Sequence, residues 1–316
     1  MSNNLKDDDQ FIQPSQNSMN DSEIDFRAIL SVIWCAKWWV VVITIVFTFL
    51  AAVYAINQPN IYKAEALLAP AESEGNTGLG GLAGQFGGLA SLAGVNLSGQ
   101  GVNKTHLALE VMRSRKFTSE FIQKHDLLPE LLAAKKWNSG SDSIIYHEGL
   151  YNPVTKQWVR EVTLPRVSKP SMQEAYKAFR KILTINTDKD TGMVTISIEH
   201  ISPSIAKRWV DWLVEDINQS MKERDVLEAH QSTDFLTKQL ESTNVADIRS
   251  VLYNLIEEQA KTIMFANVRD EYVFKTIDPA LVPESKDRPH RGLIIMLGFI
   301  FGLTLSLTSI FIRSYF

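Results

Sequence analysis

The six histidines are the residues best suited to acid–base chemistry or metal binding, but their spacing predicts neither. No two of them form the H-E-x-x-H arrangement or another spacing typical of metal ligands. His147 and Glu148 are adjacent, so their side chains point apart in a helix or a strand. We therefore expect no metal site. The histidines are His106, His125, His147, His200, His230 and His290.

Motifs for nucleophiles and phosphate binding give the same expectation. The sequence has no P-loop and no G-x-S-x-G nucleophile motif. Gly78–Ala83 matches the G-x-G-x-x-A dinucleotide pattern, but no helical pattern follows directly and no acidic ribose ligand is evident in a strand. Catalytic groups assembled from distant residues would escape such a search. We expect no enzyme activity, no catalytic residues and no cofactor.

Two uncharged apolar stretches, Trp38–Ile56 and Gly292–Ile312, dominate the organisation of the chain. Each is close to the roughly 20 helical residues that cross a bilayer core of about 30 Å. Two crossings place both termini on one side of the membrane and residues 57–291 together on the other. The sequence therefore predicts a membrane hairpin that carries one large domain.

Each stretch has an alternative interpretation. The first could be a cleavable signal peptide, but the mostly polar residues 1–37 precede it, whereas signals begin close to the N-terminus. The second could be a buried core helix, although its length argues against that. Basic residues near the two stretches are almost balanced. We favour cytoplasmic termini because Lys37 abuts the first stretch and long loops cross largely regardless of charge.

The large loop has the composition of a folded domain without disulfides. The only cysteine of the chain, Cys35, lies outside it. The net charge of −4 gives no reason to expect nucleic-acid binding. Tyr62–Leu68 and Glu271–Ile277 have strand patterns, whereas Gly75–Gly101 is so rich in small residues that we interpret it as a flexible insertion.

The clearest local signals in the loop are a β-hairpin and a long helix. Apolar residues alternate in Leu183–Thr187 and Val194–Ile198, on either side of a loop that contains Gly192. Ser202 and Pro203 are a typical helix start, and an apolar stripe then continues to about Glu241. The stripe is formed by Ile205, Trp209, Leu213, Ile217, Val226, Ala229, Thr233, Leu236 and Leu240.

A second helix is predicted over about 245–266, with a stripe of Val245, Ile248, Leu252 and Leu255. The first helix, about 203–241, is the longer of the two. We therefore expect part of its length to be left for contact with further copies of the chain.

With these features the chain resembles the bacterial polysaccharide co-polymerases, the Wzz-type chain length determinants. The motifs that carry the resemblance follow the order of that family along the sequence. They are Glu23–Arg27, Ile61–Leu68, Met112–Phe117, Ala206–Val210 and Ile277–Pro283. The ordered combination is specific, whereas each motif alone is not.

The resemblance implies a multi-pass protein of the bacterial inner membrane with an α+β fold. Two transmembrane helices would flank a periplasmic α/β base with a long helical arm, and several copies would assemble as a ring. The implied domains are a cytoplasmic tail at 1–37, spans at 38–56 and 292–312, a periplasmic domain at 57–291 and a cytoplasmic end at 313–316. Such proteins regulate, without catalysis, the modal length of a lipid-linked polysaccharide that a separate membrane polymerase makes.

Five residues near the second span are candidates for membrane packing or partner contact. Pro279, Pro283 and Pro289 either set how the base meets the membrane or form a stiff linker. Gly298 and Gly302 form G-x-x-x-G, which lets two membrane helices approach closely. The packing partner would be the first span, a neighbouring copy or the polymerase.

The most specific expectation is a regulator of lipopolysaccharide O-antigen length. Its expected partners are further copies of itself, the polymerase, the lipid-linked polysaccharide and the lipid bilayer, but no nucleic acid. The alternative is a scaffold for capsule or exopolysaccharide export. A membrane-anchored sensor would need a cytoplasmic output domain, and residues 1–37 and 313–316 do not provide one.

Overall fold

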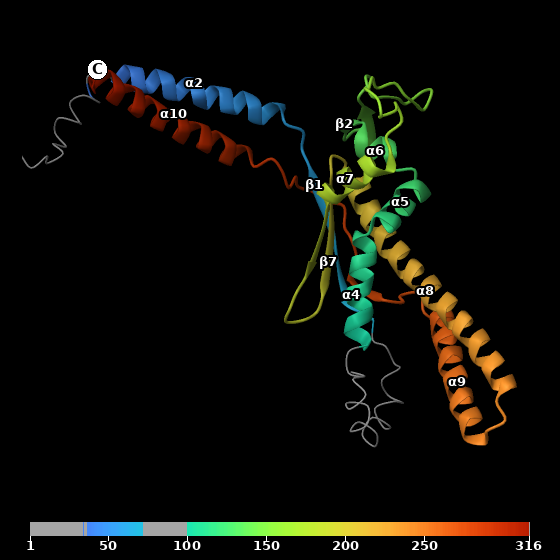
Figure 1. Ribbon diagram of the computed structural model, residues 1–316. Helices are drawn as coiled ribbons and strands as arrows, with labels where there is room; N and C mark the ends of the chain where they lie inside the picture. The colour runs from blue at the N-terminus through green and yellow to red at the C-terminus, as the bar shows by residue number, and fades with distance from the viewer. Residues whose placement is uncertain (1–33, 35–36, 72–99, 316) are drawn as a thin grey trace, which may run out of the picture. The chain divides into compact units, whose positions relative to one another are not determined.

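A computed structural model describes residues 34, 37–71 and 100–315 of the chain. It divides into two compact units (Figure 1). The described part of the first unit is built from helix α2 (Lys37–Asn57) and helix α10 (Arg291–Tyr315). The second unit comprises Asn57–His290 and contains every strand in the described ranges. The predicted α+β class with two candidate membrane helices is confirmed.

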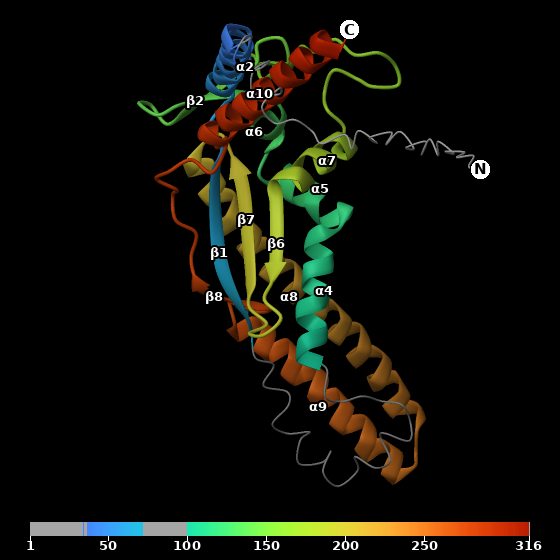
Figure 2. The same ribbon diagram turned by 90° about the vertical axis from the view of Figure 1, so that its left-hand side faces the viewer.

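An antiparallel sheet of four strands forms the centre of the second unit (Figure 2). Its order is β6 (Leu183–Thr187), β7 (Val194–His200), β1 (Tyr62–Pro70) and β8 (Phe274–Asp278). The predicted hairpin is therefore present, and the last strand starts later than its pattern indicated. Gly192 supplies the positive φ of 70° that the turn between β6 and β7 requires.

The register of the sheet places the apolar residues of neighbouring strands opposite one another. Ala64 pairs with Ile198, Ala66 with Ile196, and Leu68 with Val194. All six side chains are buried. Because side chains alternate between the two faces of a strand, this register gives one continuous apolar face for helices to cover.

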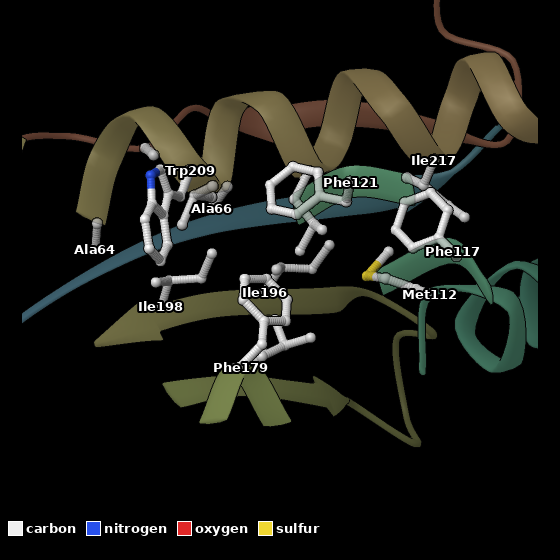
Figure 3. Close-up of a cluster of buried hydrophobic side chains, with 14 of the residues drawn as sticks. Ala64, Ala66, Met112, Phe117, Phe121, Phe179, Ile196, Ile198, Trp209 and Ile217 are labelled. Atoms are coloured by element: carbon white, nitrogen blue, oxygen red, sulfur yellow. The ribbon is translucent and has the colours of Figure 1, made fainter. Parts of the chain in front are cut away.

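Helix α8 (Pro203–Ser242) covers that face with its N-terminal half. It begins as predicted: the Ser202 hydroxyl accepts a hydrogen bond from the amide of Ile205, and Pro203 occupies the first turn. Trp209 lies over the alanines of β1 and beside Ile198, where the small side chains leave room for the indole (Figure 3). Phe117, Phe121 and Phe179 complete the core from the neighbouring helices, and truncating such a residue typically costs about 3–5 kcal/mol.

Shorter elements surround this core. Helices α4 (Gln100–Arg113), α5 (Arg115–Lys124), α6 (Leu128–Leu132) and α7 (Met172–Ile182) supply most of its remaining side chains. Ser171 and Ser114 cap α7 and α5. Two small hairpins lie between α6 and α7; they pair β2 (Ala134–Asn138) with β3 (Ser143–Tyr146), and β4 (Tyr151–Asn152) with β5 (Gln157–Trp158).

The C-terminal half of α8 pairs with helix α9 (Ala246–Val268). The predicted stripe of α8 is confirmed, since Ala229 is buried and Val226, Thr233, Leu236 and Leu240 are half-buried. The predicted stripe of α9 is wrong: of its members only Leu252 is buried, whereas Ile248 is 49% and Leu255 is 39% exposed. The less exposed residues of α9 are Arg249, Leu252, Ile256, Gln259, Thr262, Ile263, Phe265 and Ala266.

The sheet packs against the first half of α8 and α9 packs against this helix as well. Leu227 and Phe235 of α8 are nevertheless exposed, so the expected contact of this helix with further copies of the chain stays a prediction. The expected flexible insertion Gly75–Gly101 and the Gly78–Ala83 pattern lie outside the described residues, apart from Gln100 and Gly101 at the start of α4.

Candidate membrane-packing and assembly sites

The two candidate glycines lie where α10 packs against α2. A Cβ atom added to Gly298 would collide with the Cβ of Ala51. A Cβ atom added to Gly302 would lie 2.9 Å from Phe47 Cβ and 3.1 Å from Thr44 Cα. Side chains larger than hydrogen therefore do not fit unless the helices move apart. Within this unit, the G-x-x-x-G pair packs against α2, the candidate first span.

Other contacts in this unit join the same two helices. The rings of Phe47 and Phe301 meet edge to face with centroids 5.6 Å apart. Arg291 Nε donates a hydrogen bond to the carbonyl oxygen of Ala55, 3.1 Å away. An apolar groove of about 660 Å³ beside the glycine contact is lined by residues of both helices, including Leu50 and Leu297.

Most other apolar side chains of α2 and α10 are exposed, as expected for helices that face lipid. Phe49 is 66% exposed and Met296 is 63% exposed. A core helix of a soluble protein would bury such residues. Both helices have the length and apolar composition needed to cross a bilayer.

The candidate prolines lie in the other unit, on the segment that follows β8. Pro279 is exposed, whereas Pro283 and Pro289 are half-buried. Between the first two, Ala280 is buried and belongs to the core. The role of these prolines stays a prediction.

The same segment is held against the start of β1 by backbone hydrogen bonds. The amide of Ile61 donates to the carbonyl oxygen of Arg288 at 2.9 Å, and the amide of Asp287 donates to the carbonyl oxygen of Ile61 at 2.8 Å. The Arg288 guanidinium also pairs with the Glu199 carboxylate on β7. The first residues of the domain and its last residues are thereby joined.

Asn218 of α8 is a buried polar side chain that the sequence patterns did not single out. Its Oδ1 accepts hydrogen bonds from the amides of Val273 and Phe274, at 2.8 Å and 2.9 Å. Its Nδ2 donates to the carbonyl oxygen of Phe274 at 3.0 Å. The side chain thus pairs with backbone groups at the start of the edge strand β8 that no further strand pairs with, and it links this strand to α8.

Asp216 directly precedes the core residue Ile217 on α8 and is also buried. Its Oδ1 accepts one hydrogen bond from Lys124 Nζ at 2.6 Å, and its Oδ2 lies 2.9 Å from His125 Nε2. The His125 ring stacks on Trp212, with centroids 4.2 Å apart. The hydrogen bond to Asp216 raises the pKa of Lys124. These contacts join the end of α5 to α8.

A second ionic cluster lies around Asp225 of α8. Asp225 accepts hydrogen bonds from Lys104 Nζ at 2.9 Å and from the Tyr272 hydroxyl at 2.7 Å. Burial, together with the neighbouring Asp225 carboxylate, raises the pKa of Tyr272. This cluster joins α4, α8 and the segment before β8.

His200 at the end of β7 is held as a neutral ring. Its Nδ1 accepts a hydrogen bond from the amide of Ser202, so its Nε2 carries the proton and donates to the carbonyl oxygen of Glu130 at 3.1 Å. Burial lowers the pKa of His200. Each of these polar groups has a structural partner, and in the described ranges no three His, Cys, Asp or Glu side chains are grouped to hold a metal ion.

The α8–α9 pair exposes apolar side chains outside its internal contact. We call this set the arm surface: on α8 it contains Leu227, 60% exposed, and Phe235, 66% exposed. On α9 it contains Ile248, Val251 and Leu255, which fall on one side of the helix because they follow i, i+3 and i+7 spacing. Exposed apolar groups mark a contact with another protein where they form a contiguous patch, whereas single ones are common.

Residues 22–125 match the family model described as the Wzz chain length determinant protein. The resemblance expected from the ordered motifs is confirmed by this match. Among solved structures, the chain is similar to a full-length bacterial polysaccharide co-polymerase at 12% identity, over 90% of this chain and 96% of the other, with a TM-score of 0.37. It is also similar to a fragment of WzzB, a polysaccharide co-polymerase from Salmonella Typhimurium, at 13% identity, over 72% of this chain and 99% of the other, with a TM-score of 0.31. No curated protein matches the chain.

Proposed function

We propose that this chain, whose residues 22–125 match the Wzz chain length determinants, regulates the modal length of a lipid-linked surface polysaccharide, most specifically lipopolysaccharide O-antigen. The family match is the single observation that carries this proposal. It spans the stretch that contains α2, β1, α4 and α5, and thus part of both units.

The architecture supports a regulator that acts by shape. The polar residues of the second unit hold elements together: Asn218 fastens β8, Asp216 fastens α5, and Asp225 fastens α4. In our proposal the chain itself forms and breaks no bond of the polymer. It provides a membrane-anchored surface that the growing polysaccharide or its polymerase contacts.

We further propose that several copies act together, with the arm surface as the contact between them. An exposed Phe235 or Leu227 costs free energy in water, about 25 cal/mol for each Å² of apolar surface left uncovered. A neighbouring arm of the same sequence offers matching apolar residues. The geometry of the assembly would then help to set when extension stops.

In this proposal α2 and α10 cross the bacterial inner membrane, both termini are cytoplasmic and the second unit is periplasmic. The closely packed Gly298 and Gly302 keep the two spans together. Reporter fusions at Asp126 and Lys222, in the second unit, test the orientation. A signal at these positions from a reporter that works only in the cytoplasm would contradict this orientation.

Deletion of the gene tests the function. We expect surface polysaccharide to be made but to lose its preferred length on a gel, and complementation to restore that length. An unchanged length distribution would contradict the proposal. Loss of polysaccharide from the surface would instead support the export scaffold.

A further inference from the structure

The chain enters and leaves the second unit at one place. Helix α2 ends at Asn57, and Ile61 forms a bridge with Arg288, shortly before α10 begins at Arg291. Even fully extended, the connections 57–61 and 288–291 each span at most roughly 10–15 Å. If α2 and α10 cross a bilayer, the Ile61–Arg288 bridge must therefore lie close to its surface.

The β2–β3 hairpin is attached to this place. The ring of Tyr62, the first residue of β1, packs edge to face against Trp137 of β2, with centroids 5.4 Å apart. A second chain of aromatic contacts continues outwards, from Tyr146 to Tyr151 and from Tyr151 to Trp158. In Figures 1 and 2 this region occupies the end of the second unit opposite the tip of α8 and α9.

The surface of this region combines apolar and basic side chains. Val154 and Leu164 are each 90% exposed, and Val167 is 61% exposed. Residues 134–169 contain six basic residues against three acidic ones; two of the basic residues, Arg160 and Arg166, pair with Glu174, whereas Lys135, Lys136 and Lys156 are exposed. Single exposed apolar residues are common, but exposed apolar residues together with exposed basic residues on one segment are typical of segments that lie on an anionic membrane.

We propose that residues 134–169 form a contact surface for anionic phospholipid headgroups. Val154, Leu164 and Val167 would enter the interfacial region, and Lys135, Lys136 and Lys156 would approach the lipid phosphates. This contact would limit the tilt of the second unit on its two short connections. The inference rests on the membrane spans of the proposed function and not on the identity of the polysaccharide.

The test places a fluorophore on the full-length protein. With Cys35→Ser as background, Val154→Cys or Leu164→Cys carries the probe, since neither exposed side chain supports the core. Lys189→Cys is the matched control: it is exposed and lies in the β6–β7 turn, beyond the Leu68–Val194 pair and so at the sheet end away from Tyr62. Each protein is placed in nanodiscs of phosphatidylcholine with phosphatidylglycerol, some lipids carrying a headgroup nitroxide quencher.

We expect quenching at positions 154 and 164 but not at position 189. Omitting phosphatidylglycerol, or replacing Lys135 and Lys136 with Gln, should weaken it, because each lysine lost lowers the ratio of docked to undocked surface about fivefold. Lys189→Gln with Lys238→Gln removes the same charge elsewhere and should leave quenching unchanged.

Equal quenching at positions 154 and 189 would overturn the inference, as would quenching that is indifferent to phosphatidylglycerol. A probe signal that rises with protein concentration and ignores the lipid quencher would assign the surface to a second copy and overturn it too. Polysaccharide length is measured separately, so these results can fail while length control persists.

Discussion

The side-chain amide of Asn218 forms two hydrogen bonds with the backbone of Phe274, one as donor and one as acceptor. Asn218 is on the long helix and Phe274 opens the edge strand β8, which leads back towards α10. Both residues are buried. This pair therefore connects α8 to the segment that precedes α10.

Asn218→Asp should destabilise the second unit by about 2–3 kcal/mol, because an oxygen would replace the donor that faces the carbonyl of Phe274 in a buried place. Thermal unfolding of the detergent-solubilised protein measures the loss. Gln219→Ala changes an exposed neighbour on the same helix and should have little effect. An Asn218→Asp protein that melts with the wild type would show that the amide does not fasten β8.

Gly298→Ala should destabilise the packing of α2 on α10 by about 1–3 kcal/mol, because the new methyl group collides with Ala51. Adding Ala51→Gly to the same chain removes the collision and should restore stability. Gly292→Ala is the matched control, since a Cβ atom there meets nothing within 4 Å. Thermal stability in detergent and the length distribution of the polysaccharide are the measurements. A lack of rescue would contradict the contact.

Phe235→Glu should reduce assembly and broaden the polysaccharide length distribution, because a carboxylate would be buried in the proposed contact between arms. The side chain is 66% exposed in the isolated chain, so melting of the single chain should hardly change. Thr237→Glu adds the same charge at an exposed position two residues away, on the opposite side of α8. Mass photometry of both variants should show smaller particles only for Phe235→Glu.

Acidification should weaken the second unit through His200. Burial lowers the pKa of this ring in the folded state, so below its ordinary value of 6.5 the unfolded chain takes up a proton that the folded chain does not. The stability is fully present above pH 6.5 and falls by up to about 1.4 kcal/mol for each pH unit below it, until the folded pKa is reached.

Melting temperatures at about pH 7.5 and about pH 5.5 test this, because they lie on either side of the ordinary histidine pKa. His200→Gln should lower stability at both values and reduce the difference between them. The exposed His230→Gln should retain the wild-type difference. An equal acid loss in wild type and His200→Gln would assign the effect to other groups.

Local patterns predicted most of the elements correctly. The length of the uncharged stretches predicted α2 and α10, and the alternation around Gly192 predicted the β6–β7 hairpin. The Ser202–Pro203 start and the apolar stripe predicted α8 almost to its last residue. These predictions succeed because each element must bury one face, and the apolar residues of that face recur in the sequence with the period of a helix or a strand.

The sequence by itself thus determined the two long apolar helices, the β6–β7 hairpin and the long helix α8, and it named the two glycines, whereas it did not indicate α6 or the hairpins β2–β3 and β4–β5. Only the tertiary structure decided that these glycines face Ala51 and Phe47, that α9 turns Leu252 and Ile256 inwards instead of Ile248, and that Asn218 meets β8. These decisions depend on surfaces that are distant in the chain. The periodic pattern of one segment does not determine these contacts. Which residues of an element are buried depends on the shape and the unpaired polar groups of the element that packs against it.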